Sequence, residues 1–368
     1  MGADKGIGEV LLPSIESIFN GSLANRVWIY GAGGFGRACF DALTRHGIVV
    51  SGFIDRYPQN YPEGVNGLAV FPAQDFSDLE SIVFIAVLNP GGSHQDLKMW
   101  AQGRFGTICF PQDFVHFLPD IARFWLQPVA AEEIFSRHPS SLRDLFRDEP
   151  SKIILDLVLE ARLGRSFDLD RFVSHSDQYV PDFIRFDRPI SFLDVGAFDG
   201  DSFLSLLGAG HRVARWMAFE PDLQNFDNLI KTSKRYVDVE ITLVPCGLSD
   251  VVDEFSFVWD GASSKVGVGA GNTSVCRVVP FDDMYPNTPV DYVKMDIEGG
   301  ELRALAGMSN LLKRCRPTVA ISAYHKWDDI PVFMEFLGDA MPNGQFYLRQ
   351  HSFSCLDTVL YYVPLERC

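Results

Sequence analysis

The sequence predicts an α/β protein with two Rossmann-like domains, because one local design occurs twice in its 368 residues. Residues 26–56 and residues 190–222 each contain a short apolar strand, a glycine turn, a helical stretch and a second strand that ends in an acid. Each segment therefore has the pattern of a β-α-β unit. Such units form parallel sheets with helices on both faces. A chain of this length also suits two domains of roughly 100–200 residues each.

The first domain is expected to occupy residues 1–115. Apolar runs predict its strands at 27–30, 66–71, 81–88 and 107–109, and helical patterns follow at 37–45 and 94–102.

A helical connector is expected over residues 116–189. Apolar residues at helical spacing predict one face of a helix made by Ile153, Leu157, Val158 and Ala161. The end of this segment, residues 167–188, is expected to be irregular.

The second domain is expected to occupy residues 190–368. Apolar runs predict its later strands at 240–245, 291–296, 318–322, 345–349 and 358–363. The last two are close enough in sequence to pair as an antiparallel hairpin at an edge of the sheet.

The composition limits the classes of partner. The chain has 48 Asp and Glu against 32 Lys and Arg, a net charge of −16, so neither nucleic acid nor an anionic lipid surface is an expected partner. Its longest apolar run, residues 82–88, is far shorter than the roughly 20 residues that span a bilayer. The first residues lack the pattern of a secretory signal. Seven cysteines without a C-x-x-C pair indicate free thiols, a cytoplasmic protein and no zinc site.

The glycine loop of the second domain is typical of a nucleoside site. Gly196 follows Asp194 where a strand gives way to a helix, so the backbone can approach a ligand there. The next strand ends at Glu220, whose carboxylate can accept both ribose hydroxyls. After the following strand, Gly247 and Leu248 can wall an adenine ring.

The acids of this loop favour a cationic donor. Asp194, Asp199 and Asp201 would repel phosphates, and the loop lacks the further glycines of a pyrophosphate site and a Walker lysine. The same acids suit the sulfonium and amino groups of S-adenosylmethionine. Together, the predicted cofactor contacts are Asp194, Gly196, Ala197, Asp199, Glu220, Pro221, Gly247, Leu248 and Asp296.

Seven segments then support a resemblance, in this order along the chain: DQYVPDFI, FLDVGAFDGD, AFEPD, VPCGLSD, VDYVKMDIEGGELRAL, ISAYHKWDDIP and YLRQHSFSCLDTVLYYVP. With them, residues from about 176 to 364 resemble the FkbM family of class I S-adenosylmethionine-dependent O-methyltransferases. The resemblance implies a class I methyltransferase sheet and methyl transfer to a hydroxyl, often of a sugar, a lipid-linked glycan or a polyketide. It also implies that Asp194, Gly196 and Glu220 contact the cofactor. The family often has Asn in the glycine loop, where this chain has Phe198 and Asp199.

Three residues are candidates for the chemistry of transfer. Asp296 and Glu298 follow the fourth strand of the second sheet, and His325 follows the fifth, all at the ligand edge. A histidine there can act as a general base towards a hydroxyl. The alternatives without a catalytic role are that Asp296 and Glu298 are solvated acids that cap a helix and that His325 only stabilises the fold. The three residues suit a metal by ligand type, but no metal is expected, because three residues from two strand ends are weak evidence for a metal site. Arg349 and His351 are further candidates for the same cleft.

The glycine loop of the first domain has the pattern G-x-G-x-x-G. Gly31, Gly33 and Gly36 lie between a strand and a helix, and Asp55 ends the next strand. This is a dinucleotide fingerprint in its proper context. The region resembles the N-terminal domain of nucleotide-sugar acyltransferases, which implies that it binds a nucleotide or a nucleotide sugar. A scaffold without ligand and a redox domain are the alternatives.

The sequence thus predicts transfer of a methyl group from S-adenosylmethionine to a hydroxyl of a small-molecule or glycan substrate. The alternative is a nucleotide-sugar or dinucleotide-binding protein whose methyltransferase domain is inactive. Residues 259–273 are expected to form a glycine-rich loop over the cleft or a surface excursion. Assembly into a homo-oligomer is left open.

Overall fold

The computed structural model describes residues 26–87, 93–115, 117–118, 121, 139–166, 172–174, 176–260, 263–266, 273–353 and 356–367. The chain divides into two compact units, of which one comprises residues 1–129 and 160–170 and the other residues 130–159 and 171–368. The expected domain boundaries after residues 115 and 189 stay predictions, because compactness does not show where a segment folds independently.

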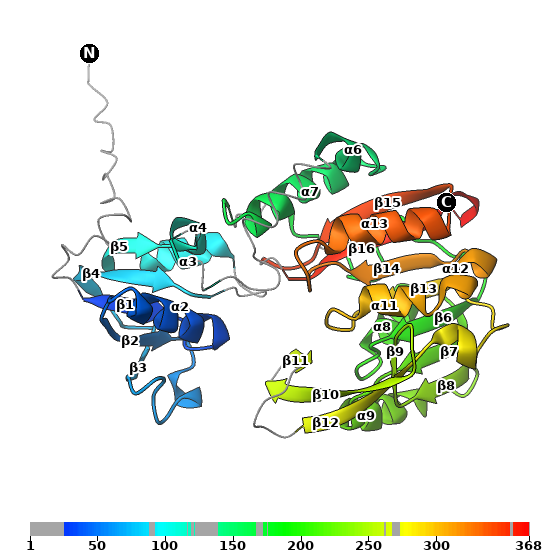
Figure 1. Cartoon of the computed structure of the whole chain (residues 1–368), viewed down its shortest axis with the longest axis horizontal. Coiled ribbons are helices and arrows are strands. Elements are labelled where there is room, and N and C mark those ends of the chain that lie inside the picture. Colours follow the sequence, from blue (N-terminus) through cyan, green and yellow to red (C-terminus); the bar gives the residue numbers. More distant parts are fainter. Residues whose placement is uncertain are drawn as a thin grey trace, which may run out of the picture. The chain divides into compact units, whose positions relative to one another are not determined.

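The first unit contains a parallel sheet of the predicted kind (Figure 1). Its strands have the order β3-β2-β1-β4-β5, so the central strand β1 lies between the strand that follows it in sequence and one from further along the chain. A crevice is expected at such a switch point, beyond the carboxyl end of β1. The described elements are β1 (Val27–Tyr30), α2 (Gly34–Arg45), β2 (Val50–Asp55), β3 (Val70–Pro72), β4 (Asp78–Ile85), α3 (His94–Ala101), β5 (Phe105–Cys109) and α4 (Pro111–Phe114).

The second unit contains a seven-stranded sheet with the order β15-β16-β14-β13-β6-β7-β8 (Figure 1). Only β16 runs antiparallel to its neighbours, so the predicted hairpin at the edge is confirmed. The strands are β6 (Ile190–Val195), β7 (Val213–Phe219), β8 (Glu240–Val244), β13 (Tyr292–Met295), β14 (Thr318–Ser322), β15 (Gly344–Gln350) and β16 (Thr358–Pro364). The helices are α6 (Pro139–Asp144), α7 (Glu149–Arg162), α8 (Asp201–Gly208), α9 (Leu223–Ser233), α10 (Phe281–Met284), α11 (Glu301–Ala306), α12 (Ser309–Cys315) and α13 (Asp329–Ala340).

The central strand β6 explains how this sheet is stabilised. All six of its residues are buried, which fits a strand covered on both faces. Both of its polar residues have a partner: the Ser191 hydroxyl donates to the carbonyl of Pro289 at 2.7 Å, and Asp194 forms an ion pair with Lys294. Buried polar groups are tolerated only when paired in this way.

Helix α7 confirms the helical pattern predicted before the second sheet, with a somewhat different buried face. Val158 and Ala161 of the predicted face are buried, whereas Ile153 and Leu157 are only half-buried. Ile154 and Leu155 are buried in their place, because three apolar residues in a row fit two faces equally well.

The second unit also contains a four-stranded sheet that was not predicted from the sequence. Its order is β11-β10-β12-β9, with β9 (Gly247–Leu248), β10 (Asp253–Asp260), β11 (Ser263–Val266) and β12 (Thr273–Val279). The glycine-rich loop expected over residues 259–273 is therefore wrong in part, since both of its ends and residues 263–266 lie in strands. Aromatic and β-branched residues are concentrated in β10, at Phe255, Phe257, Val258 and Trp259, a composition that could have predicted a strand. Residues 261–262 and 267–272 lie outside the described part.

The described helices include none that is long and apolar enough to span a membrane. The described cysteines are free thiols, of which four are buried and Cys315 is half-buried. Cys355 and Cys368 lie outside the described residues.

Candidate active site

The glycine loop between β6 and α8 has a backbone that few residues can adopt. Its φ angles are +75° at Gly196, +49° at Phe198 and +92° at Gly200, all in the left-handed region. Helix α8 begins directly afterwards at Asp201, with Gly200 as its N-cap residue, so the first turn of the helix follows the loop without a break. A non-glycine residue in this region costs about 1–2 kcal/mol. Phe198 is thus a strained residue, and half of its side chain is exposed.

Gly196 also lies against the end of β13. A Cβ atom built on it would be 2.0 Å from the carbonyl oxygen of Asp296, which is a backbone atom. Any larger residue would push the two strand ends apart. Gly196 therefore serves both the turn and the close approach of the two loops.

A buried ion pair joins the same two strands. Lys294 Nζ lies 3.4 Å from Asp194 Oδ1 and also donates to the carbonyl of Gly196. The other carboxylate oxygen accepts from Trp216 Nε1 at 3.3 Å. Burial raises the pKa of Asp194 to about 6, although Lys294 opposes that shift. Asp194 has no exposed surface, so its direct contact with a cofactor stays a prediction, while the structure shows it stabilising the loop.

Glu220 links the loop to the end of β7. Its two carboxylate oxygens accept from the amides of Phe198 and Asp222, each at 2.9 Å. Burial raises its pKa above the ordinary value, although these amides oppose the shift. Each oxygen retains acceptor capacity, so ribose hydroxyls can still bind there.

The remaining predicted cofactor residues lie at the same edge of the sheet. Backbone hydrogen bonds join Gly196 and Ala197 to the carbonyl of Phe219, at the end of β7. Pro221 follows directly, and β9 places Gly247 and Leu248 just beyond β8. The carboxyl ends of parallel strands are where such folds bind ligands. The structure therefore brings these predicted residues to the ends of β6, β7, β8 and β13.

The predicted catalytic residues meet at the ends of β13 and β14. His325 Nε2 lies 3.5 Å from Asp296 Oδ1 and 3.6 Å from Glu298 Oε2. On the other side of the ring, Nδ1 lies 2.9 Å from Glu301 Oε1. Burial lowers the pKa of His325, but Glu301 and the other acids outweigh it and raise the pKa to about 9. In this arrangement His325 holds a proton at neutral pH, which limits its predicted role as a base there.

Two tyrosines that the sequence did not single out hold Asp296 in place. Tyr179 donates to Asp296 Oδ2 at 2.9 Å, and the Tyr324 hydroxyl lies 3.3 Å from Oδ1. Burial and then Asp296 raise the pKa of Tyr179 well above its ordinary value, so it keeps its proton and remains a donor. Tyr179 lies within the segment DQYVPDFI, and its distance from β13 in the sequence concealed its role.

The two further candidates serve other contacts. Arg349 forms an ion pair with Asp148 at 2.5 Å. His351 Nε2 lies 2.8 Å from the Tyr361 hydroxyl, and burial lowers the His351 pKa to about 4. Neither is joined to His325 by a described contact.

The glycine loop of the first unit also has the predicted form. Gly31 has a φ of +105°, and a Cβ on Gly36 would lie 1.9 Å from the carbonyl oxygen of Gly31. Asp55, at the end of β2, accepts from the amides of Ala32 at 2.9 Å and Tyr57 at 2.8 Å. Gly33 precedes α2 as its N-cap residue.

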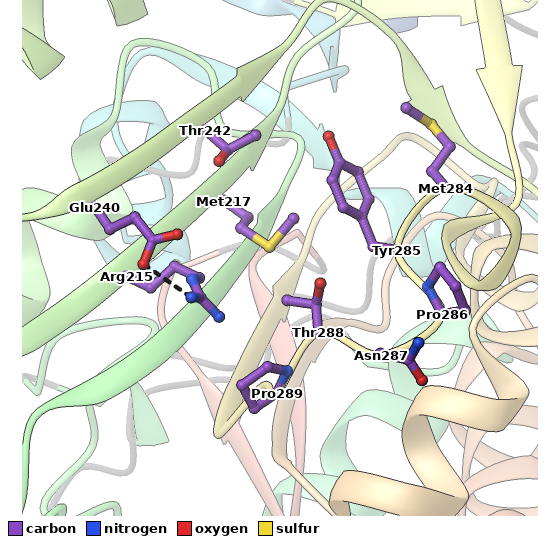
Figure 2. A pocket seen from close by; sticks show the side chains of 10 residues that line it. All are labelled: Arg215, Met217, Glu240, Thr242, Met284, Tyr285, Pro286, Asn287, Thr288 and Pro289. Carbon is purple, nitrogen blue, oxygen red and sulfur yellow. Dashed lines mark hydrogen bonds and ion pairs between the residues drawn. The ribbon is translucent and has the colours of Figure 1, made fainter.

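An open pocket of about 440 Å³ lies elsewhere in the second unit (Figure 2). Arg215 and Glu240 face it from β7 and β8 and form an ion pair at 2.8 Å, opposite Tyr285. These side chains lie towards the amino ends of the strands, and none of the predicted site residues lines this pocket. The carboxyl edge, with its buried charges, therefore remains the candidate active site.

The sheet order, with one antiparallel strand next to the edge, and the loop after β6 define a class I methyltransferase fold. Residues 194–346 match the family model of the methyltransferase FkbM domain, and residues 26–90 match that of the PglD N-terminal domain. Within the second unit, residues 194–346 are therefore similar to the methyltransferase domain of the FkbM family. None of the curated proteins matches the sequence.

Three solved structures are similar to this chain, and the first of them shares its fold. The match with the crystal structure of methyltransferase FkbM from Methylobacillus flagellatus spans 92% of this chain and 90% of that chain, with 23% sequence identity and a TM-score of 0.73. An rRNA methylase from Streptococcus thermophilus covers 48% of this chain over 87% of its own, with 14% identity and a TM-score of 0.33. The match with an O-methyltransferase from Bacillus cereus, in complex with SAH, spans 65% of this chain and 98% of that chain, with 14% sequence identity and a TM-score of 0.33.

Proposed function

We propose that this protein transfers the methyl group of S-adenosylmethionine to a hydroxyl oxygen of a sugar or glycoconjugate. The observation that carries the proposal is the convergence of the glycine loop, Glu220 and the His325 cluster on one sheet edge of a methyltransferase domain. In the reaction the sulfur–methyl bond breaks, an oxygen–methyl bond forms, the hydroxyl proton passes to a base, and S-adenosylhomocysteine leaves. The chain's part is to align the hydroxyl behind the methyl group and to accept that proton.

The cofactor end of the site supports a nucleoside. The loop after β6 offers backbone close to the ligand edge, and Glu220 is positioned by two amides for ribose hydroxyls. Neither feature needs a phosphate. Asp199 is half-buried in the same loop and adds negative charge, which suits the sulfonium of the methyl donor.

The acceptor end supports a polar substrate. Asp296 and Glu298 can receive a hydroxyl proton, while Tyr179 and Tyr324 fix the orientation of Asp296. Such oriented carboxylates suit the hydrogen-bonding hydroxyls of a sugar.

Labelled S-adenosylmethionine tests the proposal. The full chain is incubated with hydroxyl-bearing acceptors, and transfer of labelled methyl groups is followed together with cofactor affinity by calorimetry. We expect His325→Ala to lower the transfer rate at least tenfold with nearly unchanged cofactor affinity. Cofactor binding without transfer to any acceptor would favour the alternative of an inactive domain.

The first unit supports a second candidate function. Its loop places Gly31 and Gly36 in contact, and its PglD-type match covers the same residues. We propose that it binds a nucleotide or a nucleotide sugar. Titration with UDP-sugars, NAD and NADP tests this, and an absence of binding by all of them would favour a scaffold.

A further inference from the structure

Glu301, the first residue of α11, joins two loops of the candidate active site. Its side chain is buried, and Oε1 accepts from the amides of Ile297 at 3.0 Å and Gly299 at 3.3 Å, in the loop after β13. The same oxygen lies 2.9 Å from Nδ1 of His325, in the loop after β14. One buried carboxylate therefore holds the loop that contains Glu298 together with the imidazole.

The contact with Glu301 determines which ring nitrogen of His325 can react. With Nδ1 against a carboxylate, the neutral ring keeps its proton on Nδ1, so Nε2 is the atom that gains or loses a proton. Nε2 has no hydrogen-bond partner among the described residues, although only 3% of the side chain is exposed. It lies 3.5 Å from Asp296 Oδ1 and 3.6 Å from Glu298 Oε2, whose side chains are 24% and 42% exposed. Nε2 is thus directed at the side of the cluster that an acceptor can reach.

Four further ionisable side chains face this imidazole, namely those of Asp296 and Glu298 after β13, Tyr324 beside it and Asp357 directly before β16. The rings of Tyr324 and His325 lie 4.2 Å apart. The three acids favour a protonated ring, whereas burial disfavours it.

Glu301 makes the largest contribution in favour of the protonated ring. Burial lowers the pKa of His325, but Glu301 and, after it, the acids beyond β13 outweigh burial and raise the pKa to about 9. Burial raises the pKa of Glu301, but His325 outweighs it and holds that pKa below its ordinary value. The imidazole is therefore a much stronger base than a carboxylate with the ordinary pKa of about 4.

We propose that Nε2 of His325 takes the proton of the acceptor hydroxyl and that Glu301 is the positioning residue for this step. The inference rests on the proposed methyl transfer. Nε2 takes the proton while the oxygen–methyl bond forms, and the electron pair of the breaking sulfur–methyl bond leaves with S-adenosylhomocysteine. Glu301 stays ionised and stabilises the imidazolium, which then loses the proton to water. Because the base must first lose its own proton, the transfer rate should rise about tenfold per pH unit from pH 7 and level off near the pKa of His325.

Glu301→Gln in the full chain tests the proposal, because glutamine retains an oxygen for the two amides but has no charge. Nuclear magnetic resonance of ¹⁵N-labelled histidine follows the pKa of His325, whose signal is the one absent from His325→Ala. We expect this pKa to fall by at least one pH unit. The highest rate of labelled methyl transfer should fall at least tenfold, and the pH at which the rate levels off should fall with the pKa. The affinity for S-adenosylmethionine, measured by calorimetry, should change less than twofold.

Asp282→Asn is the matched control. Its carboxylate also accepts from two amides at the start of a helix, those of Asn310 and Leu311 at 2.7 and 2.9 Å, and none of its described contacts is with a histidine. This variant should leave the His325 pKa and the pH profile unchanged, whatever its stability in thermal unfolding.

An unchanged His325 pKa or an unchanged highest rate in Glu301→Gln would overturn the proposal, because Glu301 would then only anchor the loop after β13. A parent protein that binds S-adenosylmethionine but transfers no methyl group would overturn the proposed function. The resonance titration needs no transfer, so it distinguishes that failure from the absence of a Glu301–His325 pair.

Discussion

Gly196→Ala is a sharp perturbation of the candidate active site. Alanine at a φ of +75° costs about 1–2 kcal/mol. Its Cβ would lie 2.0 Å from the carbonyl oxygen of Asp296, so the two backbones must separate by about 1.4 Å to reach an ordinary 3.4 Å contact. Overpacking of this kind costs about 1–3 kcal/mol. Together the expected loss in the free energy of unfolding is about 2–5 kcal/mol.

Two assays follow from that displacement. Thermal unfolding should show a midpoint lowered by about 4–20 °C, at about 2–4 °C per kcal/mol for a unit of this size. Calorimetry should show at least a tenfold loss of S-adenosylmethionine affinity, because the loop and the end of β13 move apart.

Gly338→Ala is the matched control. Gly338 lies in α13, has no atom within 4 Å of the added Cβ and has an ordinary φ. Alanine there should stabilise the protein by about 0.5–1 kcal/mol. If Gly196→Ala were as stable as the parent and bound the cofactor equally well, the close approach of the two strand ends would not exist in solution.

The remaining predictions concern the charges and the strain of the same loop. Glu220→Gln should weaken S-adenosylmethionine binding at least tenfold by calorimetry, and an unchanged affinity would place the ribose elsewhere. Lys294→Met leaves Asp194 buried without its ion-pair partner, so urea unfolding should show a free energy of unfolding lowered by about 3–5 kcal/mol. If the losses in Lys294→Met and Asp194→Asn simply added up in the double variant, the two side chains would not interact. The pKa of Asp194 in the folded protein, about 6, exceeds its ordinary value of 3.8. The free energy of unfolding of the parent, relative to that of Asp194→Asn, should therefore decrease as the pH rises from 4 to 6 and stay constant above pH 6. Phe198→Gly should stabilise the protein by about 1 kcal/mol, because it removes the backbone strain. A lower stability of this variant would show that the contacts of the phenyl ring contribute more than the strain costs.

Much of the fold could be predicted because its signals are local. The strands β1, β14 and β16 are continuous apolar runs, and the sequence placed them within about one residue. The strands β10 to β12 were not predicted because their segment is rich in glycine and serine, which masked the aromatic and β-branched residues of β10. Here the missed signal was present in the sequence.

The candidate site divides in a similar way. Asp296, Glu298 and His325 could be predicted to meet, because parallel strands end at one edge. The role of Tyr179 could not, since it reaches Asp296 across 117 residues. Lys294 was visible in its motif, but nothing in that motif identified Asp194 as its partner.

The sequence by itself determined the two β-α-β units, the hairpin at the edge of the second sheet and the edge at which the candidate site residues gather. Apolar runs and glycine turns are local, and right-handed crossovers then leave little choice of topology. The tertiary structure alone decided which charges are paired and which are left over: Asp194 with Lys294, Glu301 with His325, and Asp296 with its two tyrosines. These partnerships depend on packing between segments far apart in the chain, where a displacement of one ångström breaks a hydrogen bond.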